Sequence, residues 1–313
     1  MNNYSGIAVA IAWPQFKGKQ TGSWYDKPMA WLGINRNAHY KVGHAAMLLV
    51  NCATGKCYHF DCGRYHTPFQ HGRIRDESTD ANLAITTKAI IVGNKINNIA
   101  TLLNEIQNNK SCNGMGNLHA SYCAVNFQLA YTNIKKIQNK GVIPFGPFVL
   151  QGINCCRFVR LGILGGKPKI KHQFMLRYLW PFKPMPISNV QCLDHKIIIS
   201  KTIENKTHPA IISTKDNLKG TLLAPAKPKN ISKNSQWLSG EVAGSWFLLE
   251  QIKNEYIITR YSADGKQECT GKFKLMDTQN FDIKTPYTFT HLSHCNQVSI
   301  IQHPYLLKFH RIN

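Results

Sequence analysis

Two adjacent cysteines, Cys155 and Cys156, follow Asn154 in this 313-residue chain. Asparagine is a preferred helix N-cap, because its side-chain oxygen accepts hydrogen bonds from the free N–H groups of the first helical turn. Cys155 is then the first helical residue, where the positive end of the helix dipole stabilises a thiolate. Apolar residues and the Gly165–Gly166 pair predict a half-buried helix and its end. Cys155 is therefore a candidate nucleophile and Cys156 a packing residue; the alternative is that both are ordinary buried thiols.

A thiol nucleophile needs a base, usually a histidine, and His44 has the most informative surroundings among the thirteen histidines. It is the one polar side chain in the apolar segment 42–50, which predicts a buried strand. Residues 56–62 predict a second strand. The Ala53-Thr54-Gly55 turn between the two indicates an antiparallel hairpin.

The hairpin places further polar side chains beside His44. With the turn centred between residues 53 and 54, Asp61 lies opposite Ala46 and His59 lies opposite Leu48. Both then share the face of His44, because side chains alternate along a strand. A third group of this kind fixes the tautomer and orientation of a catalytic base. Asp61 fits the hairpin offset better, and His59 is the alternative.

The order of these motifs resembles the circularly permuted papain-like proteins of the NlpC/P60 superfamily, which include lecithin:retinol acyltransferase-like and PPPDE-type proteins. The resemblance is carried by the Gly-His-Ala sequence around His44, a polar residue on the next strand, and Asn-Cys-x-x-Phe-Val at residues 154–159. It implies that Cys155 is the nucleophile, His44 the base and Asp61 the third group. Many permuted members have a histidine as the third group, which keeps His59 as the alternative.

The whole chain is similar to an uncharacterised two-domain bacterial family in which Phe-Asp-x-Gly-Arg-Tyr (here residues 60–65) and Gly-x-Asn-Cys (here 152–155) recur. The expected fold class is α+β. A permuted papain-like catalytic domain is expected over residues 1–200, and a basic linker or surface excursion over 201–235. An antiparallel β domain, a partial barrel or lipocalin-like meander, is expected over 236–313.

Apolar patterning predicts the elements that position these residues. In the first domain we expect strands at 6–13, 83–91 and 118–125 and helices at 96–106 and 127–137. In the second we expect strands at 245–249, 256–261, 271–275, 287–292 and 298–301, with a hairpin turn at Ala263-Asp264-Gly265.

The basic residues indicate that an anionic substrate or partner could bind to this protein. Arg64, Arg73 and Arg75 follow the hairpin and could bind a substrate carboxylate or phosphate through bidentate hydrogen bonds; the alternative is that they are solvated surface residues. The chain has 38 Lys and Arg against 16 Asp and Glu, an excess that attracts anionic partners such as acidic membrane surfaces or nucleic acid. The basic residues lack regular aromatic interleaving, which disfavours nucleic acid without excluding it. A general enrichment in Lys, Asn and Ile is the alternative explanation.

The ten cysteines are scattered, unlike a compact disulfide framework, so we expect reduced thiols and a cytoplasmic location. Cys57, His59 and Cys62 lie close enough in the sequence to suggest a zinc site, but on a strand the side chain of Cys62 points away from the other two. We therefore expect no metal and no cofactor. No apolar run reaches the roughly 20 residues of a membrane-spanning helix, and residues 6–13 lack the preceding basic region of a signal peptide.

These observations predict a cysteine-dependent hydrolase that cleaves an amide, peptide or ester bond through an acyl-thioester intermediate. The backbone N–H of Cys155 would contribute to the oxyanion hole, and His44 would transfer protons. Two alternatives stay open: an acyltransferase of the lecithin:retinol acyltransferase-like type, and a non-catalytic basic binding or adaptor protein. The sequence leaves the substrate undetermined.

Overall fold

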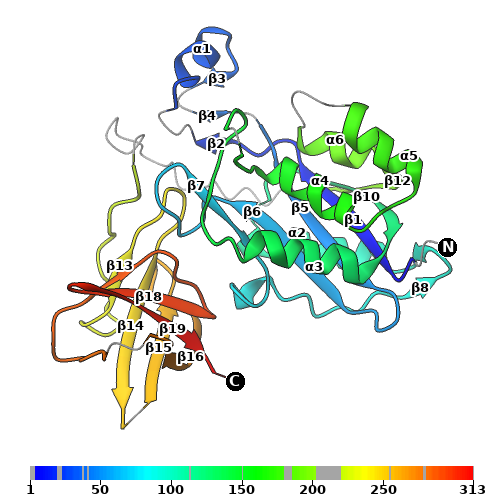
Figure 1. The fold of residues 1–313 in the computed structure, drawn as a ribbon. Coiled ribbons are helices and arrows are strands. Elements are labelled where there is room, and N and C mark those ends of the chain that lie inside the picture. The colour runs from blue at the N-terminus through cyan, green and yellow to red at the C-terminus, as the bar shows by residue number, and fades with distance from the viewer. Residues whose placement is uncertain are drawn as a thin grey trace.

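The computed structural model describes ten stretches of the chain, and they form two antiparallel sheets of seven strands each (Figure 1). The described stretches are residues 4–19, 23–36, 39–40, 42–112, 114–149, 151–179, 185–201, 220–253, 255–277 and 280–312. Helices pack on the first sheet, whereas the elements described after residue 220 are all strands. The protein is therefore α+β with a C-terminal β domain, as predicted.

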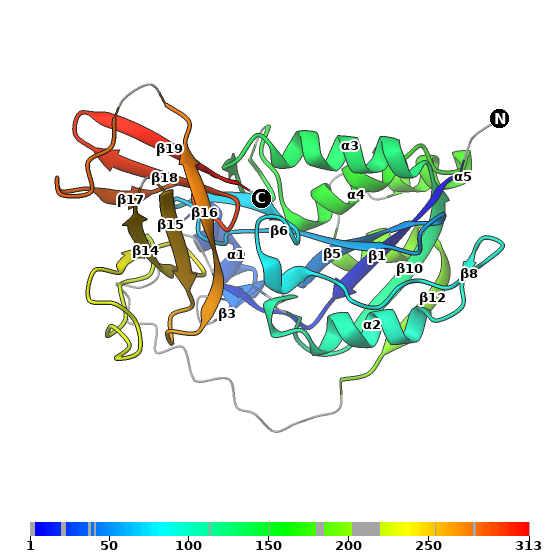
Figure 2. The same cartoon turned by 90° about the horizontal axis from the view of Figure 1, so that it is seen from below.

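The first sheet has the strand order β11-β7-β6-β5-β1-β10-β12. Its strands are β1 (Gly6–Trp13), β5 (His44–Asn51), β6 (Cys57–Gly63), β7 (His71–Arg75), β10 (Leu118–Val125), β11 (Ile143–Pro144) and β12 (Asp194–Ile199). One face carries α3 (Phe127–Gln138), α4 (Cys155–Gly165) and α6 (Pro186–Gln191), and the other carries α2 (Ile99–Asn108) (Figure 2).

Shorter elements surround this sheet. They are β2 (Gly18–Lys19), α1 (Asp26–Trp31), β3 (Asn35–Arg36), β4 (His39–Tyr40), η1 (Ala81–Leu83), β8 (Ile91–Val92), β9 (Lys95–Ile96), η2 (Lys110–Cys112), α5 (Ile170–Phe174) and the π-helical turn η3 (Met175–Leu179). The segment with α1, β3 and β4 stands out from the body of the first domain in Figure 1.

The central strand β1 is buried along its whole length, which explains its continuous apolar sequence. Its alanines pack into a core cluster under α3, α4 and α6. Its larger side chains Ile7, Val9 and Ile11 belong to a second cluster beneath α2. The sheet therefore separates two cores, and any residue of β5 or β6 belongs to one or the other by the parity of its position.

Most predicted elements of the first domain are present, with small shifts at their ends. The β5–β6 hairpin has the predicted register, with Ala46 opposite Asp61 and Leu48 opposite His59. The strands at 6–13 and 118–125 are β1 and β10. The helix predicted over 127–137 is α3, and the one predicted over 96–106 is α2.

The strand predicted over residues 83–91 is wrong. This segment leaves η1 and continues as irregular chain until β8. Leu83, Ile85 and Ala89 are nevertheless buried in the cluster beneath α2. An extended coil that crosses the face of a sheet buries alternate side chains, so it has the period-two pattern of a strand without the ladder hydrogen bonds.

The second sheet has the order β13-β14-β15-β16-β19-β18-β17. Its strands are β13 (Gln236–Leu238), β14 (Ser245–Ile252), β15 (Glu255–Tyr261), β16 (Gln267–Leu275), β17 (Thr288–Thr290), β18 (Gln297–Gln302) and β19 (Tyr305–Arg311). The two edge strands nearly meet, because the Gln236 side chain donates to Tyr287 O (3.0 Å) and accepts from Phe289 N (3.2 Å). The sheet is thus a nearly closed barrel around an apolar core.

The predicted strands of this domain correspond to β14 to β18, and the turn at Ala263–Gly265 joins β15 to β16. The sequence prediction missed the two outer elements of the domain in chain order, β13 and β19. The first sheet ends at Ile199 and the second begins at Gln236. Residues 202–219 of the predicted linker lie outside the described residues, and the domain boundaries stay predictions.

The expectation that all thiols are reduced is wrong for one pair. Cys269 of β16 and Cys295, in the turn before β18, form a disulfide. The two are only 26 residues apart, but they belong to different strand pairs, so their spacing alone did not indicate a bond. Eight further cysteines in the described residues are free. Over the same residues, no helix is long and apolar enough to cross a membrane.

Replacing Cys269 and Cys295 together by serine is expected to lower the free energy of unfolding by about 3 kcal/mol. The reason is that the disulfide joins residues 26 positions apart and so restricts the unfolded chain. Thermal unfolding with and without dithiothreitol measures the effect. The native protein should melt lower when reduced, and the double variant should not respond. Cys52→Ser, which removes a half-buried free thiol, is the matched control. An unchanged melting temperature on reduction would contradict the assignment.

Candidate active site

Helix α4 begins at Cys155, as the sequence predicts. The Asn154 side chain accepts a hydrogen bond from Arg157 N at 2.8 Å and caps the first turn. Phe158 and Val159 are buried in the core under α3, α4 and α6, which fixes the helix against the sheet. Cys155 is half-buried. The helix therefore holds this thiol at its positive end while leaving it partly accessible.

Cys156 differs from its neighbour in its surroundings. It is buried in the same core, and its carbonyl accepts a hydrogen bond from Asn189 Nδ2 at 2.9 Å. Its Sγ lies 3.8 Å from Cys155 Sγ. Contact with Cys155 and burial raise the pKa of Cys156 well above that of a free thiol. Cys156 is therefore a packing residue, as predicted, and its sulfur is within hydrogen-bond distance of the Cys155 sulfur.

His44 is the first residue of β5 and is buried between aromatic rings. Its ring stacks on Trp13, with centroids 5.7 Å apart, and packs at a tilt on Phe16 at 5.5 Å. Its Nε2 lies 3.9 Å from Asp61 Oδ2, an ion-pair distance longer than a hydrogen bond. Two aromatic rings thus contact the imidazole, and a carboxylate lies near its Nε2.

Charges at this site favour a thiolate and an imidazolium. Burial alone would lower the pKa of His44, but Asp61 and Cys155 outweigh it and raise the pKa to about 9. Contact with Cys156 lowers the pKa of Cys155 well below that of a free thiol; burial opposes this shift and His44 reinforces it. Near neutral pH the pair therefore carries opposite charges, the form that makes cysteine nucleophilic.

Asp61 lies on β6 and is completely buried. Arg75 of β7, directly opposite in the register, donates to both of its oxygens, from Nε to Oδ1 at 2.9 Å and from Nη2 to Oδ2 at 2.5 Å. Burial would raise the pKa of Asp61, but Arg75 and His44 together lower it below its usual value. Asp61 is therefore an anion despite its burial.

His59, the alternative third group, lies two residue pairs further from His44 along the hairpin than Asp61 does. Asp61 is the diagonal neighbour of His44 in this register, which is within reach of its side chain. Neither ring nitrogen of His59 has a hydrogen-bond partner in the described part of the chain. Burial lowers the pKa of His59 to about 4, so its ring is neutral at neutral pH. The geometry favours Asp61 as the partner of His44.

The three arginines proposed to bind substrate lie in ion pairs within the protein. Arg75 holds Asp61. Arg73, 1% exposed, donates to both oxygens of Asp80 at 2.7 and 2.9 Å. Arg64 pairs with Glu241 of the second domain. These contacts correct the picture of solvated arginines and give all three a structural role; direct contact with a substrate stays a prediction.

Sequence reasoning missed the role of Arg75. The pattern His71-Gly-Arg-Ile-Arg75 has a buried isoleucine between two arginines, which places both arginines on the face that carries Asp61. A strand paired with β6 would have put one of them opposite the carboxylate. The aromatic partners of His44 lie outside the two motifs and gave no comparable signal.

The segment before Cys155 forms a constrained turn. Phe145 and Ile153 make an isolated parallel bridge, and the Arg157 guanidinium donates to the Gly152 carbonyl at 2.6 Å. Phe148 packs on Tyr25, with ring centroids 5.2 Å apart. This turn therefore connects the cysteine helix to the segment containing α1, where Trp24 and Trp31 are strongly exposed.

The two cysteines considered as zinc ligands, Cys57 and Cys62, lie in different cores. Cys57 belongs to the core beneath α2, whereas Cys62 belongs to the core under α3, α4 and α6, so the two point to opposite faces of the sheet. Among the residues described above, no three His, Cys, Asp or Glu side chains are grouped to hold a metal ion.

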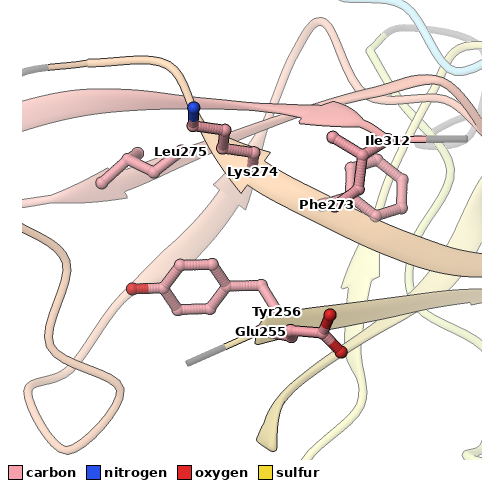
Figure 3. A pocket seen from close by; sticks show the side chains of 6 residues that line it. All are labelled: Glu255, Tyr256, Phe273, Lys274, Leu275 and Ile312. Atoms are coloured by element: carbon pink, nitrogen blue, oxygen red, sulfur yellow. The ribbon is translucent and has the colours of Figure 1, made fainter. Parts of the chain in front are cut away.

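A pocket on the second sheet is separate from this site (Figure 3). It has a cavity volume of about 320 Å³ and is lined by Glu255, Tyr256, Phe273, Lys274, Leu275 and Ile312. All of these residues belong to the second domain, and the lining holds no cysteine or histidine. It therefore offers no thiol–imidazole pair of the kind formed by Cys155 and His44.

The fold and the site together define a two-domain α+β protein in which a cysteine at a helix start meets a histidine and a buried aspartate. The model of the family described as type VI secretion system effector TseH-like matches residues 8–170, slightly more than half of the chain, and the chain belongs to this family. The matched range contains all three residues. A second model, described as the DUF6695 C-terminal domain, matches residues 235–312 and spans the second sheet.

Among solved structures, the chain is similar to the crystal structure of the type VI secretion system effector TseH. The identity is 15% and the TM-score 0.40, over 64% of this chain and 94% of that chain. No curated protein matches the chain.

Replacing Asp61 by asparagine is expected to lower the pKa of His44 from about 9 to its ordinary range or below, because burial then outweighs the remaining favourable charges. An NMR titration of the His44 ring measures this change. In the native protein the interaction stabilises the fold below the unfolded pKa of His44, and this contribution is lost as the pH rises through about 9. In the variant the His44 pKa no longer exceeds its unfolded value, so this contribution should be absent.

The same substitution at Asp264, an exposed turn residue of the second domain, is the control and should leave His44 unchanged. Circular dichroism shows whether each variant is folded. An unshifted His44 titration in folded Asp61→Asn would mean that Asp61 does not set the charge of His44.

Proposed function

We propose that this protein is a cysteine-dependent hydrolase that cleaves an amide, peptide or ester bond through an acyl-thioester. The observation that supports this most directly is the placing of Cys155 at the start of α4 beside His44, which is itself paired with a buried, charged Asp61. A nucleophile, a base and a group that orients the base are what covalent acyl chemistry requires.

In the proposed reaction the Cys155 thiolate attacks the carbonyl carbon of the substrate. The carbonyl oxygen becomes an oxyanion, which the free N–H groups at the start of α4, including that of Cys155, can stabilise. The bond to the leaving group then breaks, and the His44 imidazolium gives its proton to the leaving amine or alcohol. Cys155 is left as a thioester and His44 as a neutral base.

Hydrolysis of the thioester completes the cycle. His44 takes a proton from water as the water oxygen attacks the thioester carbonyl, and the carbon–sulfur bond breaks. The products are a carboxylic acid and the restored thiolate–imidazolium pair. Asp61 stabilises the imidazolium in both halves of the reaction without itself accepting a proton.

The order of the site residues supports a finer proposal, that the first domain is a circularly permuted papain-like module of the NlpC/P60 type. The histidine strand β5 precedes the cysteine helix α4 by about a hundred residues, the order expected of the permuted form. Family membership supports a further proposal, that the chain acts as a type VI secretion effector. Cytoplasmic residence is the competing expectation.

Acyl transfer differs from hydrolysis only in what attacks the thioester. The contacts described above contain no dedicated site for a second amine or alcohol, so hydrolysis is the simpler proposal. The net charge of +22 supports an anionic substrate or partner, which also stays a proposal.

Iodoacetamide at pH 6 is expected to label Cys155 faster than any other cysteine, because alkylation requires a thiolate. Peptide mapping by mass spectrometry identifies the site. Cys52, also a half-buried free thiol, is the internal reference, because burial raises its pKa. His44→Ala should remove the selectivity. If Cys155 labels no faster than a thiol in the unfolded chain, the nucleophile assignment fails.

Hydrolysis is expected with an activated ester such as p-nitrophenyl acetate and with a pool of acylated peptide amides. Cys155→Ser should lose at least about 10³-fold in kcat, because removing a nucleophile removes the covalent path, and Cys52→Ser should keep native activity. Intact-mass analysis after rapid quenching should show an acyl group on Cys155. Added hydroxylamine reports the competing pathway, since a hydroxamate product in large excess over acid would favour the acyltransferase.

A further inference from the structure

The loop between β6 and β7, residues 64–70, is held by the second domain. The Glu241 carboxylate pairs with the Arg64 guanidinium at the start of the loop and accepts a hydrogen bond from Gln70 N, at 3.0 Å, at its end. Glu241 is buried and the Arg64 side chain nearly so. One carboxylate of the second domain therefore joins the two ends of a loop of the first.

The middle of the loop is held by the residues that follow Glu241. Tyr65 and Ala243 form an isolated parallel bridge, and His66 N donates to Ala243 O at 3.3 Å. His66 Nε2 lies 2.8 Å from Ser245 Oγ. We refer to residues 241–245, which connect β13 to β14 and include the first residue of β14, as the clamp segment. Its backbone and side chains contact the loop along its length.

The loop in turn holds Arg75. The Tyr65 ring lies over the Arg75 guanidinium, with Cζ 3.5 Å from the ring centroid, a cation–π contact. The ring can approach because residue 63 is a glycine: a Cβ there would lie 2.3 Å from a Tyr65 ring carbon. The Tyr65 carbonyl also accepts from Arg73 Nε at 2.9 Å. Tyr65 is thus fixed by backbone and ring on the group that holds Asp61.

We propose that the clamp segment of the C-terminal domain is a positioning element for the candidate active site. It holds Tyr65 on Arg75, Arg75 holds Asp61, and Asp61 sets the orientation and charge of His44. Tyr65 and Glu241 are positioning residues, since the contacts given above reach His44 through Arg75 and Asp61. The inference rests on the proposed function, because it assumes that Cys155 and His44 react as a pair.

The contacts explain why a second domain is needed for this task. Arg75 has a long side chain with many rotamers, and its two bonds to Asp61 have fixed geometry only while the guanidinium plane is fixed. Tyr65 covers one face of that plane, and the Ser111 carbonyl accepts from Nη2 at 2.9 Å. Without the clamp segment, Tyr65 would belong to a loop bounded only by the ends of β6 and β7.

The test uses Tyr65→Leu, Tyr65→Phe and Glu241→Gln in the full chain. Leucine removes the aromatic face, phenylalanine keeps it, and glutamine keeps the size of Glu241 while removing its charge. Glu255→Gln is the matched control, because it removes the same charge in the second domain but breaks only an exposed ion pair to Lys272, between two strands of the second sheet. The readouts are the rate of Cys155 alkylation from pH 4 to 9, kcat for ester hydrolysis, and the melting temperature.

Tyr65→Leu and Glu241→Gln are expected to move the midpoint of the pH profile upward by about one unit and to slow alkylation by about tenfold at pH values below the native midpoint, since one pKa unit there changes the thiolate fraction tenfold. Tyr65→Phe and Glu255→Gln should keep the native profile. kcat should fall with the alkylation rate, while KM should change little.

A purely structural role would lower the melting temperature and leave the pH midpoint of the folded protein unchanged, and that result overturns the proposal. Should Glu241→Gln fail to fold, the comparison of Tyr65→Leu with Tyr65→Phe decides. Failure of the proposed function looks different: the native protein itself would then show no His44-dependent alkylation at low pH. If Cys155 of the native protein is alkylated selectively and the Tyr65 and Glu241 variants keep the native pH profile, the role of the clamp segment is rejected and the proposed function is not.

Discussion

A buried carboxylate keeps its charge only where donors within the protein replace water. Asp61 meets this condition through Arg75, which lies opposite it on the next strand and bonds both of its oxygens. Because Asp61 is charged, His44 holds a proton against the effect of burial, and the His44 charge in turn favours a thiolate at Cys155. The charges of Asp61 and His44 therefore follow from one cross-strand ion pair, and His44 reinforces the effect of Cys156 on the Cys155 thiol.

The sheet explains why these groups can meet although they belong to different cores. Cys155 packs against the core under α3, α4 and α6, whereas Trp13, the ring stacked on His44, belongs to the core beneath α2. Side chains from opposite faces of a sheet are separated everywhere except at its ends. His44 is the first residue of β5 and Cys155 the first of α4, so both faces contribute to a site at the end of the sheet.

Local patterns were sufficient to predict the parts of the site set by local geometry. Asn154 marked the start of the cysteine helix, and the two-residue period of the hairpin placed Asp61 and His59 on the face of His44. The rest depends on contacts that no local pattern encodes. The segment 83–91 has the alternation of a strand but packs as coil, and the partner of Arg64 was set by the docking of a distant segment. The Cys269–Cys295 pairing likewise depends on which strands become neighbours.

Asp80 forms ion pairs with two arginines that are synthesised at very different times. Arg73 is seven residues away, and Arg260 is 180 residues away. The nearer ion pair can form as soon as its segment is synthesised, whereas the farther one requires closure of a long loop and is a late step in folding. Every residue of the candidate catalytic group precedes residue 170, and the clamp segment begins at 241. The emerging chain thus contains the proposed nucleophile well before the segment proposed to align its base, so during synthesis Cys155 is present before the contacts that are proposed to activate it.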